Sequence, residues 1–181
     1  MKPANGEPTR VLGVDPGVSE TGWAVLESAP GRDTQLVASG LIRTSPRTEF
    51  PERLRAINEK LSGVLEKYRP DRFAIEEMFF SKAAHTIRAT LQTRGVIILA
   101  AAQNGTPVHE YNPRQVKAAL TGSGSAPKSQ MQKMVQATLK LRERLTPDDI
   151  ADAAAIAICD LRLGRMKSLK VLGRIGGGGI K

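Results

Sequence analysis

The sequence predicts an α/β domain in which a mixed five-stranded sheet is flanked by helices. Three observations point to this class. Strand-like segments joined by turns come first, helical and strand-like segments then alternate, and three helical segments follow one another near the end. At 181 residues the chain is long enough for one domain with a full core and too short for two of ordinary size. No internal repeat or linker divides it.

The elements are predicted from the period of their apolar residues. The first three strands are short apolar runs separated by turn-forming residues, which predicts an antiparallel meander. The helices show apolar residues at a spacing of three to four, and a connector of small residues at 121–125 interrupts the helical half. The predicted elements, in order, are strands 11–14, 22–27 and 36–42, helix 51–68, strand 72–76, helix 82–103, strand 107–110 and helices 113–120, 128–141 and 147–163.

The long helix predicted at 82–103 is apolar nearly all round. Residues such as Ile87, Leu91 and Ile98 lie at helical spacing, and Ile97 and Leu99 widen the apolar surface beyond one stripe. Such a helix is buried on more than one side. It is either a central core helix or a helix that packs against a partner copy in a twofold dimer.

Charge is unevenly distributed along the chain. The formal net charge is +9 and the isoelectric point is near 10.1, which indicates a polyanionic partner such as nucleic acid. Two thirds of this excess lies in a basic, glycine-rich tail at 164–181 and the residues just before it. We expect this tail to be flexible and to serve as a sequence-indifferent phosphate grip or as a solubilising end. Residues 1–9 are expected to form a flexible extension before a domain at 10–163.

The remaining composition narrows the class of protein. A lone cysteine, Cys159, excludes an internal disulfide, fits a reducing cytosol and is expected to pack in the core. The two histidines, His85 and His109, are isolated and predict no zinc site. The longest apolar stretch, 95–102, is far shorter than the roughly 20 residues of a membrane span, and the N-terminus lacks a signal-peptide core. A cytoplasmic protein without a membrane partner is expected.

Two acidic residues stand at predicted strand ends. Asp15 ends an apolar run and opens an Asp-Pro-Gly turn, and Glu76 ends the short apolar run at 73–75. Each has a plain structural explanation, since Asp-Pro-Gly forms turns and acids often mark the exit of a strand into solvent. Glu77 should point to the opposite side of its strand from Glu76, so at most one of the two can face a given site.

Two further acids open the last predicted helix. Thr146 is predicted as its N-cap, Pro147 as its first residue and Asp149 as the acidic partner in a capping box. Capping explains Asp149 without any function, but it does not explain Asp152. The two acids are three residues apart, so they share a helix face and repel each other unless a cation lies between them. Four carboxylates in this order would suit an oxygen-ligand metal site for phosphodiester cleavage.

Five motifs together resemble one known family. They are Gly13-Val14-Asp15-Pro16-Gly17, Ala74-Ile75-Glu76-Glu77-Met78-Phe79, Arg114-Gln115-Val116-Lys117, the segment 122–130 and Asp149-Ile150-Ala151-Asp152-Ala153. Their order and content are similar to those of the bacterial RuvC-type Holliday-junction resolvases, which belong to the ribonuclease H-like superfamily. The similarity runs from about Arg10 to about Leu163. It implies a ribonuclease H-like fold for the domain at 10–163.

The resemblance also implies site residues, cofactors and partners. It assigns catalysis and metal binding to Asp15, Glu76, Asp149 and Asp152, with two Mg²⁺ ions that Mn²⁺ could replace. Lys117 and Lys128 would lie near the scissile phosphate, Arg114 would contact DNA, and Phe79 would stack on a base at the junction centre, although Phe80 is the neighbouring candidate. The implied protein is a homodimeric, structure-selective endonuclease that resolves four-way junctions by symmetric cuts in recombination and repair. A RuvA–RuvB branch-migration complex would be its partner.

Two other functions compete with this interpretation. A non-catalytic junction- or RNA-binding relative would use the same fold and keep the acids for structure alone. An actin-like or sugar-kinase-like nucleotide hydrolase can also begin with an apolar strand that ends in Asp-x-Gly. The second alternative needs another lobe and further phosphate loops, and this chain is too short for them and has no Walker-type loop.

Overall fold

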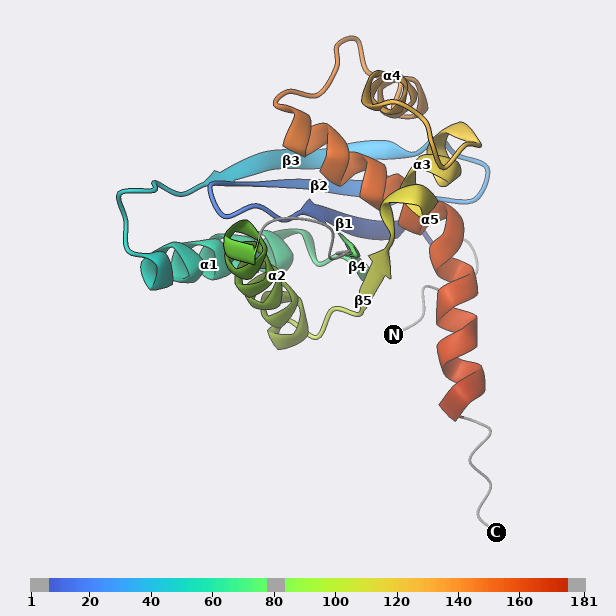
Figure 1. Ribbon diagram of the computed structural model, residues 1–181. Helices are drawn as coiled ribbons and strands as arrows, with labels where there is room; N and C mark the ends of the chain where they lie inside the picture. Colours follow the sequence, from blue (N-terminus) through green and yellow to red (C-terminus); the bar gives the residue numbers. More distant parts are fainter. Residues whose placement is uncertain (1–6, 78–83, 176–181) are drawn as a thin grey trace.

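The computed structural model describes residues 7–77 and 84–175, with side chains at 7–77 and 88–164. Its centre is a mixed five-stranded sheet with the order β3-β2-β1-β4-β5 (Figure 1). The first three strands pair antiparallel, whereas β4 pairs parallel to β1 and β5 parallel to β4. The predicted sheet is thereby confirmed. The strands are β1 (Thr9–Asp15), β2 (Glu20–Ser28), β3 (Gln35–Arg43), β4 (Arg72–Glu76) and β5 (Val108–Tyr111).

Helices cover both faces of this sheet. One face carries two helices, and the other carries the last helix with two shorter helices beside it (Figure 1). None of the helices in the described part of the chain is long and apolar enough to cross a membrane. The first face has α1 (Phe50–Tyr68) and α2 (Ala84–Gln103), and the second has α3 (Pro113–Thr121), α4 (Lys128–Thr138) and α5 (Asp148–Ile175).

Alternation along the strands divides the core into two layers. In β1, Leu12 and Val14 pack under α1 and α2, whereas Val11 belongs to the layer under α5. In β4, Phe73 and Ile75 join the first layer and Ala74 the second. Because successive side chains of a strand point to opposite faces, the residues that end these strands, at positions 15 and 76, face α5.

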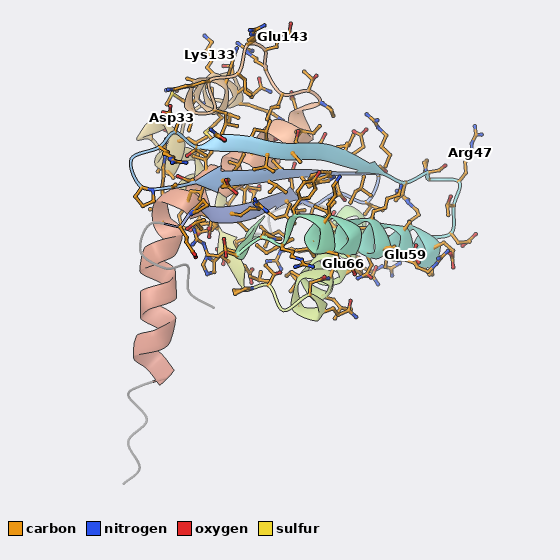
Figure 2. All side chains as sticks on the ribbon, turned by 180° about the vertical axis from the view of Figure 1, so that it is seen from behind. Asp33, Arg47, Glu59, Glu66, Lys133 and Glu143 are labelled. Atoms are coloured by element: carbon orange, nitrogen blue, oxygen red, sulfur yellow. The ribbon has the colours of Figure 1, made fainter. Side chains whose placement is uncertain are left out.

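Charged side chains take the outer surface. Figure 2 labels six of them, which project from the loops and from the outer faces of α1 and α4. All six are exposed. Their position agrees with the division of the interior into two apolar layers, because an unpaired charge is costly to bury. The six are Asp33, Arg47, Glu59, Glu66, Lys133 and Glu143.

Helix α5 lies unusually close to the sheet. A Cβ atom at Gly13 in β1 would lie 2.2 Å from the carbonyl oxygen of Ala153, and one at Gly22 in β2 would lie 2.1 Å from that of Asp149. Only glycine fits at either position. Alanines at 153–155 and 157 present small side chains to the strands and are almost completely buried. The first turn of α5 therefore rests directly over the β1–β2 pair.

Several predicted boundaries were wrong. Helix α5 begins at Asp148, so Thr146 and Pro147 precede it, and the Pro147 carbonyl accepts from the Ile150 amide at 3.1 Å. The same helix continues to Ile175, through the predicted boundary at 163, and the predicted flexible tail overlaps it. The residues after Gly164 are mostly good helix formers, which explains why the helix continues. Helix α4 ends at Thr138, three residues early.

Candidate active site

Two acidic side chains end neighbouring parallel strands. Asp15 is the last residue of β1 and Glu76 the last of β4, and the register places Val14 beside Ile75 immediately before them. Ligands in open α/β sheets bind at the carboxyl ends of parallel strands, which is where these two residues stand. Both face α5, because successive side chains of a strand point to opposite faces of the sheet.

Helix α5 brings two more carboxylates to the same edge. Gly22, the antiparallel partner of Asp15, lies directly under Asp149, and Asp152 follows on the same helix face. Burial, followed by the negative charges of Asp152, Glu76 and Asp149, raises the pKa of Asp15 to about 7. Burial and the charge of Asp152 likewise raise the pKa of Glu76. The four predicted acids therefore act on one another in space.

Two lysines share this region. The Nζ atom of Lys128 lies 3.0 Å from an Oδ2 atom of Asp152 and 3.2 Å from that of Asp148. The hydrogen bond with Asp152 raises the pKa of Lys128. The charge of Lys117 partly offsets the upward shift in the pKa of Glu76. A cleft of about 280 Å³ is lined by all of these groups except Asp148, together with Pro113, Val116, Met131, Ala155 and Ile156.

Helix α3 is set in place by a capping box that our sequence interpretation missed. The Asn112 side chain accepts from the Gln115 amide, and the Gln115 side chain accepts from the Asn112 amide, each at 3.1 Å. The signal was the spacing of Asn112, Pro113 and Gln115, which matches the N-cap, first and third helical positions. This start directs α3 so that Arg114 and Lys117 line a hollow of about 950 Å³ beside the carboxylate cleft.

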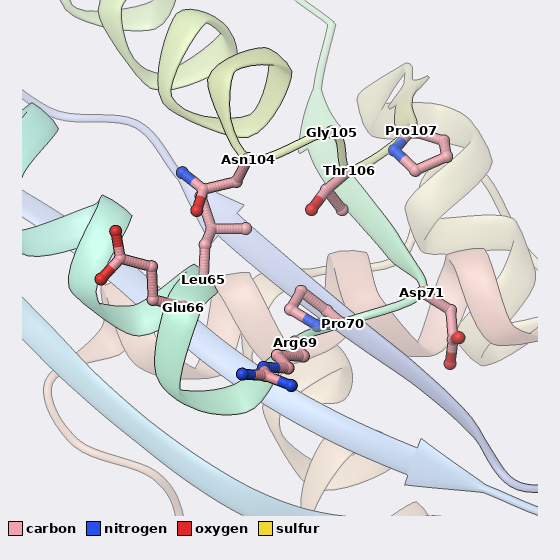
Figure 3. Close-up of a pocket in the computed structure, with 9 residues that line it drawn as sticks. All are labelled: Leu65, Glu66, Arg69, Pro70, Asp71, Asn104, Gly105, Thr106 and Pro107. Atoms are coloured by element: carbon pink, nitrogen blue, oxygen red, sulfur yellow. The ribbon is translucent and has the colours of Figure 1, made fainter. Parts of the chain in front are cut away.

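A different hollow lies at the opposite end of the parallel strands. It measures about 540 Å³ and is formed by the end of α1, the segment before β4 and the turn between α2 and β5 (Figure 3). Its acids are Glu66 and Asp71, and the Asp71 carboxylate already accepts from the Arg10 amide at 2.8 Å. This hollow lies at the amino ends of β4 and β5, where α/β sheets rarely bind ligands.

The acids fit a hard divalent cation by their chemistry, because carboxylate oxygens are the protein ligands that Mg²⁺ prefers. Within the described ranges, no three His, Cys, Asp or Glu side chains stand ready together to hold an ion. The charges explain this. Like-charged carboxylates repel one another, and Asp152 is paired with Lys128. The donor set is therefore chemically suited to such an ion.

The structure brings most of the predicted site residues to one end of the sheet. Asp15, Glu76, Asp149 and Asp152 act on one another there, and Lys117 and Lys128 line the same cleft. Arg114 is exposed in the adjoining hollow. Phe79 and its alternative Phe80 lie outside the described residues. Asp148, at the start of α5, is exposed and contacts both Lys128 and, at 2.7 Å, the Gln132 side chain.

Comparison with known proteins gives a consistent result. A family model described as "Crossover junction endodeoxyribonuclease RuvC" matches residues 11–160. The protein of that name from Endomicrobium trichonymphae is 50% identical over 149 residues, which cover 82% of this chain and 78% of that protein. The matched region includes every acid and lysine of the cleft.

Two solved structures have the same fold. The RuvC structure of Thermus thermophilus has a TM-score of 0.81 at 34% sequence identity and covers 88% of this chain and 97% of its own. T. thermophilus RuvC in complex with a Holliday junction substrate has a TM-score of 0.80 at 32% identity and covers 87% and 96%. The ribonuclease H-like architecture predicted from sequence agrees with both.

Proposed function

The chain belongs to the RuvC family of crossover junction endodeoxyribonucleases, and from this premise we propose that it resolves four-way (Holliday) junctions in recombination and repair. One observation of the site supports this above the others. At the carboxyl edge of the sheet, burial and the charges of three carboxylates from β4 and α5 raise the pKa of Asp15 to about 7. A merely structural role would not require three further negative charges to be gathered around a buried carboxyl group.

The proposed chemistry is metal-dependent hydrolysis of a phosphodiester. Family members depend on divalent metals, and we propose two Mg²⁺ ions, replaceable by Mn²⁺, held by Asp15, Glu76, Asp149 and Asp152. Such ions supply positive charge at the attacking and leaving oxygens of the phosphate. Asp15 is the central ligand, because the other three acids all act on it. Each carboxylate that loses its proton on binding contributes negative charge that fixes the cations at this edge.

The two lysines of the cleft are proposed to hold the scissile phosphate. Lys117 and Lys128 reach the carboxylates from α3 and α4, so a phosphate in the cleft would lie between positive and metal-binding groups. Arg114, in the adjoining hollow, would contact the DNA backbone farther along the strand. Phe79 is proposed to stack on an unpaired base, an interaction typically worth about 1 to 3 kcal/mol.

A homodimer is proposed from the two sides of α2. Ile97, Ala100 and Ala101 are fully buried in the core, yet Leu99 on the same helix remains 50% exposed. The helix is therefore a core helix that also presents apolar surface outward. It can pack in the core on one side and against a partner copy on the other. A twofold dimer suits symmetric cuts in a symmetric junction. A RuvA–RuvB complex in the cytoplasm, where bacterial DNA lies, is the proposed partner.

The test is cleavage of a synthetic four-way junction beside a linear duplex of matched sequence. We expect paired, symmetric nicks in the junction alone, with Mg²⁺ or Mn²⁺ present, and none with chelator. Tight junction binding without nicks under either metal would instead support a non-catalytic, junction-binding protein. Nicks in the duplex at an equal rate would contradict selectivity for structure.

A further inference from the structure

A second buried aspartate lies on α5, away from the carboxylate cleft. Asp160 has no exposed surface, and three side chains donate to it. Its Oδ1 atom accepts from His109 Nδ1 at 2.6 Å and from the Tyr111 hydroxyl at 2.8 Å, and its Oδ2 atom accepts from Arg72 Nε at 2.6 Å. We call these four side chains the Asp160 network. Its donors all come from β4 and β5, so the network ties α5 to these two strands.

The Asp160 network compensates its buried charge. Burial alone would raise the pKa of Asp160, but the hydrogen bond from His109 and the charge and hydrogen bond of Arg72 hold it below its ordinary value. The side chains of Arg72 and His109 are only 11% exposed, so these contacts are shielded from water. Directional bonds to an ionised carboxylate in such a site are strong and geometrically demanding.

Close packing sets how near α5 lies to the sheet. The carbonyl oxygens of Ala153 and Asp149 lie over Gly13 and Gly22, where only glycine leaves room for them. Larger buried side chains of the same helix, Ile156 and Ile158, pack in the core layer under α5. These apolar contacts are not directional, whereas the hydrogen bonds of Asp160 to β4 and β5 are.

The spacings along helix and strand are matched. Asp152 and Asp160 are eight residues apart, about 12 Å along an α-helix. Arg72 and Glu76 are four residues apart, about 13 Å along a strand. Asp160 binds Arg72 at one end, and Asp152 acts on Glu76 at the other. A shift of α5 that broke the first contact would move Asp152 relative to Glu76 by the same amount.

We propose that Asp160 is a positioning residue, which fixes α5 along β4 and β5 so that Asp149 and Asp152 stay beside Asp15 and Glu76 at the carboxyl edge of the sheet. This inference rests on the proposed function. Gly164 supports it independently, because a Cβ atom there would lie 2.7 Å from an Asp160 carboxylate oxygen. The next turn of the helix thus holds the carboxylate from the remaining side. Supporting contacts of metal ligands typically change metal affinity about 10- to 100-fold.

The experiment measures Mn²⁺ binding to the full, DNA-free chain by electron paramagnetic resonance. Wild type, Asp160→Asn and Leu65→Ala are compared at a temperature where circular dichroism shows each to be folded. Leu65 is a control, because it lies in the core layer under α1 and α2, away from α5. We expect Asp160→Asn to weaken Mn²⁺ binding about tenfold and Leu65→Ala to change it less than about twofold.

Three results would overturn the inference. Asp160→Asn could bind Mn²⁺ as wild type does, or Leu65→Ala could lose as much affinity, which would reduce the effect to general stability. If Asp160→Asn does not fold, Tyr111→Phe takes its place, because it removes one hydrogen-bond donor alone. The third contradicting result is an unchanged Mn²⁺ affinity in Tyr111→Phe. Failure of the proposed function looks different. Wild type would then neither bind Mn²⁺ nor nick a junction, and the inference would fall with it.

Discussion

Helix α5 contributes aspartates to two very different environments. At its start, Asp149 and Asp152 join Asp15 and Glu76, and burial with mutual repulsion raises the pKa of Asp15 to about 7. Farther along, Asp160 is more deeply buried, yet Arg72 and His109 hold its pKa below the ordinary value. The pKa values of two buried aspartates are therefore shifted in opposite directions by the groups that surround them.

The difference is the one expected between a structural acid and the acids that we propose to be functional. The Asp160 network is satisfied by the protein itself, whereas the cluster around Asp15 is incomplete without positive charge from elsewhere. Clusters of ionisable groups with strongly shifted pKa values are typical of functional sites. Four predictions test the contrast, beginning with the largest expected effect.

Asp15→Asn should nearly abolish cleavage while junction binding remains. The asparagine keeps the shape of the side chain but removes the charge on which the other three acids act. Loss of one such group at a reaction centre typically costs about 10²- to 10³-fold in rate, and a central ligand should lie at or above the upper end. The rate of junction nicking and a gel-shift titration measure the two properties. Retained cleavage would contradict the role of Asp15.

Asp160→Asn should destabilise the fold strongly. It leaves the shielded Arg72 guanidinium without its anionic partner, and breaking a buried ion pair typically costs about 3 to 5 kcal/mol. Urea unfolding at pH 8 with chelator measures the free energy of unfolding. Asp33→Asn is the matched control, because Asp33 pairs with Lys140 at the surface and is 64% exposed. Asp33→Asn should lower the free energy of unfolding by less than about 1 kcal/mol. Equal losses in both variants would remove the contrast.

Asp15→Asn should raise the free energy of unfolding, in contrast to Asp160→Asn, and this gain should grow with pH. The carboxyl group of Asp15 has a pKa of about 7 when folded and near 3.8 when unfolded. Between these values the unfolded chain has released a proton that the folded chain retains, so a rise in pH favours unfolding. The variant lacks this penalty.

The expected gain rises by about 3 kcal/mol between pH 5 and pH 8, since about two pH units of this interval lie below the folded pKa and each corresponds to about 1.4 kcal/mol. Urea unfolding of wild type and Asp15→Asn at both pH values, with chelator present, measures it. Asp160 should act in the other direction, because its lowered pKa contributes stability at neutral pH that is lost in acid as the carboxylate is protonated. A pH-independent gain for Asp15→Asn would show that its charge is not what destabilises the fold.

The two environments differed in how well the sequence predicted them. Asp15 and Glu76 could be found because each interrupts an apolar run at a strand end, a local signal. The Asp160 network could not, because its members lie far apart in the chain, and His109 had been set aside as an isolated histidine. The available signal was a single acid, Asp160, at the end of the apolar run that forms the buried part of α5. The same contact explains why residue 164 is a glycine, since a Cβ atom there would lie 2.7 Å from an Asp160 carboxylate oxygen.

Lys128→Ala should give the smallest effect of the four, and it tests whether a lysine beside the acid cluster acts on the substrate phosphate. Its ammonium group contacts Asp152 and Asp148, but the side chain is 55% exposed, so its loss should change the free energy of unfolding by less than about 1 kcal/mol. Cleavage should fall by about tenfold, because a phosphate in the cleft loses one positive neighbour. Lys133 lies on the same helix, is exposed and points outward (Figure 2), so Lys133→Ala is the control. If both variants lose cleavage equally, Lys128 supplies only general positive charge for DNA binding. A loss confined to Lys128→Ala, with unchanged junction affinity, would show that this exposed lysine acts on the reaction itself and not on DNA binding in general.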